Sequence, residues 1–433
     1  MAIATTVRHL LGDAPVAVEA FDGSRADPPS GPAKAVVVVR RPEAAARVLA
    51  HPGELGIVRA FVAGDLDVDG DLDAVLERGF TGDVRVGAAA LLDLVRASGR
   101  RLLHPPPPPP EEVRLHGSRH SRRRDADAIS HHYDVSNAFY RLVLGPSMTY
   151  SCAVFPDDTT SLEEAQAAKH ELVCRKLGLE PGMRLLDVGC GWGSLLIHAG
   201  RHHGVRGVGI TISQEQADLA RVRVAEAGLA DVVEIRLQDY RDLDDPPFDA
   251  ISSIGMFEHV GRRRLEDYAR TLVGHLRPGG RLLNHAIGRP GYPQPDTPTG
   301  HLRAAVRRLA TAAGASWPSR IESDLIDRYV FPDGELHEVG TVVSLLQEHG
   351  LEVRHLESLR EHYARTLRCW VANLEAHWDE AVREAGEGRA RVWRLYMAAC
   401  ALGFDHGTTQ VHQVLAVKPA PSGASGLPLR SDF

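Results

Sequence analysis

The 433-residue chain is predicted to be an α/β protein: a doubly wound, mainly parallel sheet preceded by a smaller α/β domain. Three observations predict this fold class. From residue 128 onward, short β-type runs alternate with helical stretches, which is typical of a parallel sheet covered by helices on both faces. Glycines alternate directly after one of these runs, at residues 189–193. Six consecutive prolines, residues 105–110, separate this part from the shorter region.

The first 104 residues are expected to form an auxiliary N-terminal α/β domain. Residues 35–40 (AVVVVR) form an apolar β-type run, and residues 41–52 and 71–80 have helical patterns. A run of prolines cannot enter the interior of a helix or sheet and favours the extended polyproline conformation. We therefore expect a Pro/Arg-rich linker at residues 105–127.

Residues 128–420 are expected to form one catalytic domain, followed by a flexible tail at 421–433. Its first long helix, residues 161–179, opens with the capping-box pair Ser161 and Glu164. The alternating run 411–418 predicts a late strand at an edge of the sheet. Further strands are predicted at 184–189, 204–212, 232–237, 248–254 and 281–287, with a helix at 214–228.

Composition excludes several classes of protein. A formal net charge of -7 argues against a general nucleic-acid binder, so we expect no nucleic-acid partner. No apolar run of about 18 residues is present, and the first residues lack the apolar core of a signal peptide. The expected location is therefore cytoplasmic.

We expect no metal ion. The five cysteines have no CxxC spacing, which disfavours both a disulfide framework and a structural zinc site. Asp65, Asp67 and Asp69 imitate the start of a calcium-binding EF-hand loop, but the position that needs a glutamate is Leu76. These acids are expected to lie in a turn and at a helix start, where negative charge suits the helix dipole.

The glycine loop is the strongest local motif. Gly189, Gly191 and Gly193 follow a predicted strand that carries Asp187 and precede a helical pattern. Glycines there let the backbone approach a ligand at a helix N-terminus. Residue 194 is serine, so the dinucleotide pattern GxGxxG is absent, as is the GK[ST] of a P-loop. The loop resembles that of class I S-adenosylmethionine-dependent methyltransferases.

Other blocks make the resemblance more specific. In their order along the chain they resemble the cyclopropane-fatty-acyl-phospholipid synthases, including mycolic-acid cyclopropane synthases and relatives that form 10-methylene fatty acids. The resemblance covers the whole catalytic domain, and residues 61–79 are similar to the auxiliary domain of the longer synthases. It implies a Rossmann-like seven-stranded sheet. The blocks are residues 131–155, 185–195, 209–216, 253–261, 284–288, 328–336 and 362–370.

The resemblance implies methyl transfer from S-adenosylmethionine to the double bond of an unsaturated acyl chain of a membrane phospholipid. The resulting carbocation loses a proton to a bound bicarbonate ion, the base used in this family. Bicarbonate can both donate and accept hydrogen bonds, which suits a carboxylate, an imidazole and a phenol. The family implies that the ion is held by Cys152, Glu258, His285, Ile287 and Tyr363.

The remaining site residues follow from the same comparison and from the chemistry. Asp239 is expected near the adenine amine, although it could be an ordinary loop acid. Many methyltransferases have an acid at the end of the second strand, but this chain has Thr211 there, which resembles the pattern of the synthase family. The expected cofactor residues are Tyr150, Ser151, Asp187, Gly189, Gly191, Gly193, Thr211, Ile212, Gln216, Gln238, Asp239 and Tyr240. Aromatic faces stabilise a carbocation, and the candidates are Tyr133, Tyr140, Phe257 and Trp370.

Acyl chains in a bilayer imply peripheral attachment to the inner face of the membrane. Arg122–Arg124, Arg262–Arg264 and the arginines of the helical pattern 300–315 suit an anionic surface, or they are ordinary solvated residues. A homodimer is compatible with the sequence, as is lipid presentation by the N-terminal domain.

Two products remain open. Proton loss from the new methyl group closes a cyclopropane ring, whereas a prior hydride shift leads to an exocyclic methylene on the route to 10-methyl (tuberculostearic) acids. Residues 391–419 look more like the actinobacterial relatives that take the second course. The rival interpretations are a small-molecule methyltransferase and a lipid-binding protein with an inactive methyltransferase fold.

Overall fold

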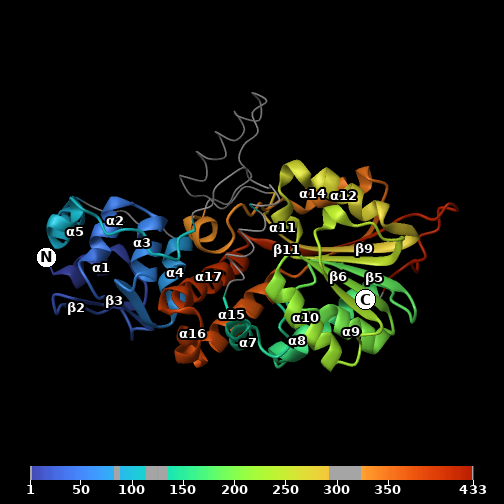
Figure 1. Cartoon of the computed structure of the whole chain (residues 1–433). Helices are drawn as coiled ribbons and strands as arrows, with labels where there is room; N and C mark the ends of the chain where they lie inside the picture. Colours follow the sequence, from blue (N-terminus) through green and yellow to red (C-terminus); the bar gives the residue numbers. More distant parts are fainter. Residues whose placement is uncertain (1, 82–87, 114–123, 125–134, 292–322, 432) are drawn as a thin grey trace. The chain divides into compact units, whose positions relative to one another are not determined.

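The computed structural model describes all residues except 1, 82–87, 114–123, 125–134, 292–322 and 432. The chain forms two compact units, each built from separate stretches (Figure 1). The smaller contains residues 1–115, 322–332 and 370–406, and the larger contains residues 116–321, 333–369 and 407–433. The ranges expected from the sequence were continuous, because packing between distant stretches leaves no local signal.

The smaller unit contains a four-stranded sheet in the order β2-β1-β3-β4, in which only β1 and β3 are parallel. The predicted strand at 35–40 is β3. The strands are Val16–Ala20 (β1), Arg25–Ala26 (β2), Ala35–Val39 (β3) and Leu66–Gly70 (β4). The helices are Ile3–Leu10 (α1), Glu43–Ala50 (α2), Glu54–Val62 (α3), Leu72–Thr81 (α4), Ala88–Ser98 (α5), Gly99–Leu102 (η1), Ile326–Val330 (η4), Trp378–Ala385 (α16) and Glu387–Asp405 (α17).

The acids that imitate a calcium loop, expected in a turn and at a helix start, lie instead directly before β4 (Asp65) and within it (Asp67 and Asp69), and the first two are bound to arginines. Asp65 accepts a hydrogen bond from Arg47 Nε at 2.9 Å. Asp67 accepts bonds from Arg40 at 2.6 Å and from the buried Arg391 at 2.9 Å. These carboxylates therefore serve as ion-pair partners in the smaller unit.

The proline run is anchored to the smaller unit and does not cross open solvent as a free spacer. Arg47 donates a hydrogen bond to the Pro107 carbonyl at 2.6 Å. Shortly afterwards, Glu112 accepts two bonds from Arg59, at 2.7 and 2.8 Å, and both side chains are buried. Such a bidentate pair fixes geometry as well as charge.

The larger unit contains the predicted doubly wound sheet of seven strands, in the order β10-β11-β9-β8-β5-β6-β7. The five strands from β5 to β9 are parallel. β5 pairs with β6 on one side and β8 on the other, so the winding direction reverses at β5, where ligands bind in such folds. The strands are Arg184–Val188 (β5), Arg206–Thr211 (β6), Val233–Leu237 (β7), Phe248–Ile254 (β8), Leu276–Gly288 (β9), Glu352–Ser358 (β10) and Gln410–Val417 (β11).

One strand position differs from the prediction. β11 was expected at an edge, but it lies between β9 and β10 and is antiparallel to both. The edge strand on this side of the sheet is β10, which the sequence did not predict. Its residues, EVRHLES, are half-buried or exposed, so they carry little of the apolar signal by which strands are recognised.

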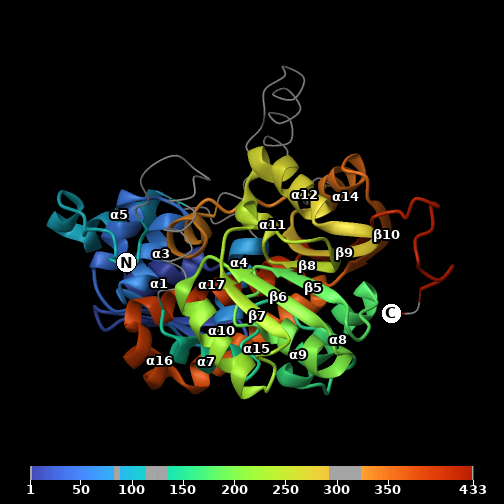
Figure 2. The same ribbon diagram turned by 45° about the vertical axis from the view of Figure 1, so that its right-hand side comes forward.

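Helices cover both faces of this sheet (Figure 2). Leu162–Leu177 (α8), Ser194–His203 (α9) and Gln214–Glu226 (α10) pack on one face, and Phe257–Val260 (α11), Leu265–Gly274 (α12) and Val339–Glu348 (α14) pack on the other. The predicted capping box of α8, Ser161 with Glu164, is present. Leu185 and Leu186 enter opposite cores, so Asp187 points to the α8 side. The other elements are Asn137–Leu144 (α7), Tyr240–Asp242 (η2), Arg262–Arg264 (η3) and Arg360–Ala376 (α15).

Candidate active site

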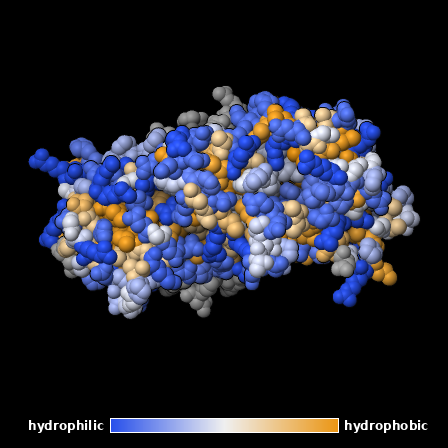
Figure 3. All heavy atoms as spheres, turned by 90° about the horizontal axis from the view of Figure 1, so that it is seen from below, coloured by the Kyte–Doolittle hydropathy of each residue, from blue (hydrophilic) through white to orange (hydrophobic). Residues whose placement is uncertain are grey.

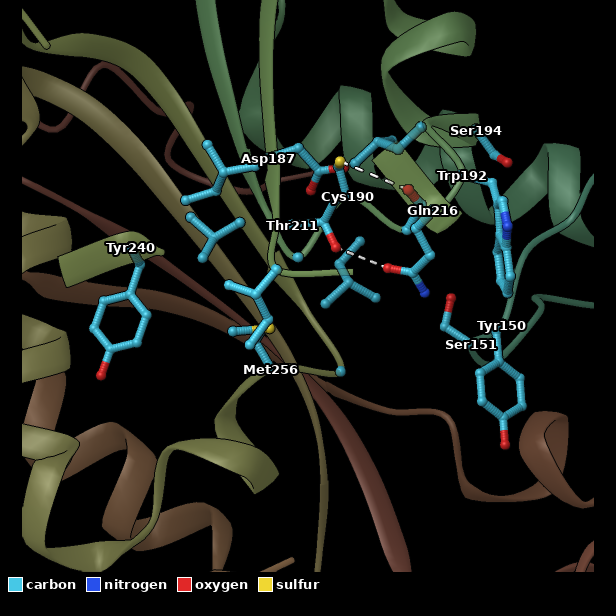
Figure 4. A pocket seen from close by; sticks show the side chains of 18 of the residues that line it. Tyr150, Ser151, Asp187, Cys190, Trp192, Ser194, Thr211, Gln216, Tyr240 and Met256 are labelled. Atoms are coloured by element: carbon cyan, nitrogen blue, oxygen red, sulfur yellow. Dashed lines mark hydrogen bonds between the residues drawn. The ribbon is translucent and has the colours of Figure 1, made fainter. Parts of the chain in front are cut away.

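A cavity lies where the chain leaves the C-terminal ends of β5, β6 and β8. It encloses about 160 Å³, roughly ten times the space that one water needs. Figure 4 shows Tyr150 and Trp192 on one side, Tyr240 on the other, and Asp187 and Thr211 between them. Of the twelve expected cofactor residues, all but Gly193 line this cavity.

At Gly189, the glycine loop approaches Met256 too closely for a side chain. Gly189 has a φ of 76°, and a Cβ there would lie 2.4 Å from Met256 Cγ. The amides of Gly189 and Cys190 both donate to the Ile210 carbonyl, at 2.9 and 3.0 Å, which ties the loop to β6. The loop leads into α9, whose first residue, Ser194, lines the cavity. A bare backbone at a helix N-terminus suits a cofactor with a polar end.

The segment that carries Tyr150 and Ser151 is tied to the glycine loop. Trp192 Nε1 donates to Asn137 Oδ1 at 2.8 Å, upstream of that segment. Arg223 donates to the Trp192 carbonyl at 2.6 Å and to the Ser147 carbonyl at 2.9 Å. Burial lowers the pKa of Arg223 to about 10, so it remains a cation near neutral pH. One arginine thus holds two walls of the cavity together.

The end of β6 uses amide and hydroxyl groups where other methyltransferases are expected to have an acid. The Thr211 hydroxyl donates to Gln216 Oε1 at 2.8 Å. The Ser213 side chain caps α10 by accepting a hydrogen bond from the backbone amide of Gln216. Both Thr211 and Gln216 are buried, so the pair is fixed before a ligand binds.

The next strand is followed by Gln238, Asp239 and Tyr240 in the cavity wall. The Asp239 carboxylate receives Arg241 Nε at 2.8 Å and the Arg241 guanidinium NH2 at 2.5 Å. A carboxylate retains further acceptor capacity in such a pair. Asp239 is therefore held by Arg241 while remaining at the wall.

Lys169 is a wall residue that sequence reasoning missed. It lies on α8, is buried, and donates from Nζ to Ser151 Oγ at 3.1 Å. Burial lowers the pKa of Lys169 to about 8, while the charge of Asp187 acts in the opposite direction. Burial likewise raises the pKa of Asp187 to about 6, against its hydrogen bond from Ser252. An ammonium and a carboxylate thus lie in the wall, with Ser151 bonded to the ammonium.

Glu258, one of the predicted bicarbonate residues, is buried on α11. Its Oε1 accepts a hydrogen bond from the Ile287 amide at 2.6 Å. Its Oε2 has no hydrogen-bond partner among the described residues. Burial raises the pKa of Glu258 to about 7, and the Ile287 amide acts against this. Ile287, another of the predicted bicarbonate residues, therefore uses its backbone amide to bind Glu258.

His285, another of the predicted bicarbonate residues, is also buried and also has a polar atom without a partner among the described residues. Burial lowers its pKa to about 3, so the ring is neutral. The Gln413 amide nitrogen lies 3.2 Å from His285 Nδ1, and its oxygen accepts a bond from Lys176 at 2.7 Å. Because an amide NH2 can only donate, Nδ1 accepts and the ring proton belongs on Nε2. Nε2 is buried and has no partner in the described part of the chain.

The remaining predicted bicarbonate residues, Cys152 and Tyr363, are linked to Ile287 through contacts with backbone groups. Cys152 Sγ lies 3.6 Å from the Leu359 carbonyl, which also accepts the Tyr363 amide at 3.0 Å. The Leu359 amide donates to Val411, which pairs with Ile287 across β11 and β9. Burial raises the pKa of the Cys152 thiol, so it is neutral. None of the five lines the cofactor cavity.

The predicted substrate aromatics are placed differently from one another. Tyr133 lies outside the described residues. Tyr140 is fully buried, with its ring 4.8 Å from Trp192 and 6.1 Å from Tyr150. Phe257 is buried against His337, at 5.6 Å between ring centroids. Trp370 is fully buried in the smaller unit.

Comparison with known proteins identifies the family of this chain. The sequence model of the mycolic acid cyclopropane synthetase family matches residues 120–414. The chain belongs to this family. It is therefore an enzyme, an S-adenosylmethionine-dependent methyltransferase.

Relatives of the cyclopropane synthetase family support this assignment along nearly the whole chain. A probable fatty acid methyltransferase of Mycobacterium tuberculosis is 44% identical over 97% of this chain and 95% of its own length. The cyclopropane-fatty-acyl-phospholipid synthase of Escherichia coli is 32% identical over 91% of both chains. The crystal structure of the mycolic acid cyclopropane synthase CmaA1 with S-adenosylhomocysteine matches 68% of this chain and 98% of its own, with a TM-score of 0.60 and 33% identity.

Proposed function

We propose that this cyclopropane synthetase family member transfers a methyl(ene) group from S-adenosylmethionine to the double bond of an unsaturated acyl chain of a membrane phospholipid, giving a cyclopropane. One observation carries the proposal. Two buried polar atoms without partners among the described residues, Glu258 Oε2 and His285 Nε2, lie around the Ile287 end of β9. Methylation of oxygen or nitrogen in a small molecule has no need of this pair.

The pair suits bicarbonate. Glu258 Oε2 is an acceptor for the O–H of the ion, and His285 Nε2–H is a donor for one of its oxygens. An unpaired buried polar atom costs about 1–3 kcal/mol, so two in one region favour a ligand that satisfies both. When bound, bicarbonate would supply a base small enough to enter a closed acyl pocket. Tyr363 and the neutral Cys152 thiol would complete its surroundings.

Positive charge lies close to the predicted bicarbonate residues. Lys169 interacts electrostatically with both His285 and Cys152, and Lys176 interacts with His285. Lys176 also orients Gln413, which in turn holds the His285 proton on Nε2. Because Lys176 is itself paired with Glu357, Lys169 is the cation that would favour an anion, while Lys176 keeps the donor directed at it.

The cofactor cavity supplies the other half of the reaction. S-Adenosylmethionine, when bound, would supply an electrophilic methyl group on a sulfonium. The glycine loop, Thr211 with Gln216, and Gln238 to Tyr240 would hold its parts, and Ser151 with Lys169 would border its amino-acid end. The chain's task is to hold donor and alkene together and to exclude water from the carbocation. The buried rings of Tyr140 and Phe257 would contribute apolar, cation-stabilising walls.

The alternative product is a 10-methylene acyl chain, made by the same first step. The stretch 391–419 favours it, and the relative named a fatty acid methyltransferase is compatible with it. Ozonolysis followed by mass spectrometry separates the two, because ozone cleaves an exocyclic methylene and leaves a cyclopropane ring intact.

We propose peripheral binding at the inner face of the membrane. Among the described residues, no helix is long and apolar enough to cross a bilayer. Arg262, Arg263 and Arg264 are exposed on η3, directly after the helix that carries Glu258. Arg124 is instead paired with Asp333, and the arginines of 300–315 lie outside the described residues. On the face drawn in Figure 3, hydrophobic residues form small groups among hydrophilic ones.

The proposal is tested with the purified chain, methyl-labelled S-adenosylmethionine and vesicles of unsaturated phosphatidylglycerol. We expect label in the acyl chains, and we expect activity to fall in bicarbonate-free buffer and to return when bicarbonate is added. Glu258→Gln and His285→Ala should lose this dependence together with most of their activity. Label transferred only to a head group, or activity equal with and without bicarbonate, would contradict the proposal. Binding of the vesicles should weaken with salt if the arginines of η3 contribute.

A further inference from the structure

A group of metal-ligating side chains lies on α8 and α9, outside the site described above. Cys174, His198 and His203 each offer one ligand atom, and these atoms lie within 4.8 Å of one another. Glu171, one turn before Cys174 on α8, places Oε2 3.1 Å from His198 Nε2 and 3.0 Å from His203 Nε2. None of the four lines the cofactor cavity.

We propose that Glu171, Cys174, His198 and His203 form a binding site for one divalent transition-metal ion, of which Zn²⁺ suits the donors best. Zinc takes four ligands from thiolates, imidazoles and carboxylates, at about 2.0–2.3 Å in a tetrahedron. Ligand atoms of such a tetrahedron lie roughly 3.3–3.8 Å apart. The Glu171–His separations of 3.0 and 3.1 Å are slightly below this range, and the ligand atoms of Cys174, His198 and His203 lie within 4.8 Å of one another. Side-chain adjustments of at most about 1 Å would therefore complete the site.

The charges and the burial of the four groups fit a metal. One thiolate and one carboxylate neutralise a divalent cation, and the two imidazoles bind as neutral ligands. Cys174 is fully buried, whereas the side chains of His198 and His203 are 15% and 17% exposed and that of Glu171 is 40% exposed. The softest ligand therefore lies inside, and the ion has a path from solvent on the Glu171 side.

Hydrogen bonding alone explains only part of this group. Imidazole N–H groups donating to Glu171 would account for the two short contacts. They do not account for a thiol sulfur within 4.8 Å of a ring nitrogen of each histidine. Burial raises the pKa of Cys174, so the group is a thiol until a metal binds. Binding then forms a metal–sulfur bond and releases the thiol proton to water, which conserves charge.

The site would act on the fold near the cofactor. α8 and α9 pack together, and α9 begins directly after the glycine loop, at Ser194. An ion shared by the two helices would fix α9 from its far end. The sequence predicted no metal because the ligands are divided between two helices, two on α8 and two on α9, and include a single cysteine, which gives no short motif. The proposal does not depend on the substrate or on catalysis.

The test uses the full chain, stripped of metal with a chelator and titrated with Co²⁺ and then Zn²⁺. We expect one Co²⁺ per chain, with a thiolate-to-cobalt absorption band in the near ultraviolet and visible bands of tetrahedral intensity, all removed by Zn²⁺. Cys174→Ser should abolish the thiolate band, and His203→Gln should weaken binding at least tenfold. Cys369→Ser, at a half-buried cysteine outside the group, is the matched control and should retain both.

The outcomes are decisive even if a variant folds poorly. A Co²⁺ spectrum of the unmodified chain without a thiolate band overturns the proposal by itself. So does a Cys174→Ser variant that binds the metal as tightly as the Cys369→Ser control. Thermal unfolding of the unmodified chain adds an independent measurement, because an ion that binds the folded chain should raise the unfolding temperature, by an amount that grows with the logarithm of the ion concentration divided by Kd. No rise at saturating Zn²⁺ would contradict the site.

Discussion

Replacing Glu258 by glutamine should stabilise the protein at alkaline pH while it damages catalysis. In the folded chain, burial raises the pKa of Glu258 from its usual 4.5 to about 7. Below pH 4.5 the side chain is neutral in both the folded and unfolded states, so its burial does not lower the free energy of unfolding. Between pH 4.5 and 7 the unfolded chain releases the proton first, so stability falls as the pH rises. Above pH 7 the full cost is present.

The magnitude follows from the same two values. The gap between 4.5 and about 7 corresponds to about 3 kcal/mol. Glutamine is neutral at every pH, and its amide oxygen can still accept the Ile287 amide hydrogen bond, which is 2.6 Å long in the parent. At pH 8 the variant should therefore be up to about 3 kcal/mol more stable than the parent, and at pH 4 the two should be alike.

The activity should change in the opposite direction. The variant places an NH2 donor where Oε2 would accept the O–H of bicarbonate. A hydrogen bond to a charged group contributes about 1.5–3 kcal/mol, which is about a 10- to 100-fold loss in kcat/KM. Affinity for S-adenosylmethionine should be unchanged, since Glu258 does not line the cofactor cavity.

Urea unfolding at pH 4 and pH 8 in bicarbonate-free buffer measures the stability difference, and turnover with labelled cofactor measures the activity. Glu266→Gln, at an exposed position on α12, is the matched control and should change neither. A Glu258→Gln variant that is less stable than the parent at pH 8 would contradict the cost of burying the Glu258 carboxylate, and one as active as the parent would contradict its role in holding bicarbonate.

Four further changes test other parts of the structure. Cys152→Ser should lower turnover without abolishing it, because the buried thiol is a neutral wall; complete loss in a folded variant would give the thiol a chemical role. Lys169→Met should weaken S-adenosylmethionine binding about tenfold by calorimetry, since Ser151 and Asp187 lose a partner of about 1–2 kcal/mol. Gln413→Leu should reduce kcat at least tenfold with unchanged cofactor affinity, because His285 loses the donor that sets its tautomer; an unchanged kcat would remove that role. Glu112→Ala should destabilise the smaller unit by about 3 kcal/mol or more in thermal unfolding, because Arg59 is left buried and unpaired.

Much of the large sheet could be predicted because its strands and helices have strong local patterns. The capping box at Ser161 and the buried strand before Gly189 are signals within a few residues, and both are present. The strand β10 could not be predicted, since an edge strand with half-buried, charged side chains resembles a loop. The place of β11 depends on its partners, which a single strand does not reveal.

The site residues also include some that a short motif reveals and others that only tertiary packing brings together. Residues within short motifs, such as Thr211 and Gly189, could be located from the resemblance and lie at the cavity. Lys169 and Gln413 could not, because a lysine in a helix and a glutamine in a strand are usually solvated surface residues. Only the packing of α8 on the sheet and the pairing of β9 with β11 bring them to the cavity and to His285. The Cys174 group was missed for the same reason.

The most direct test of the central claim is the bicarbonate dependence of methyl transfer to acyl chains. The chain is incubated with methyl-labelled S-adenosylmethionine and unsaturated phospholipid vesicles, in buffer purged of carbon dioxide and again after bicarbonate is restored. We expect labelled acyl chains that have gained one CH2, formed slowly without bicarbonate and rapidly with it. Labelled acyl chains formed equally fast in both buffers would contradict the role of Glu258 and His285, and unlabelled acyl chains would contradict the proposed function itself.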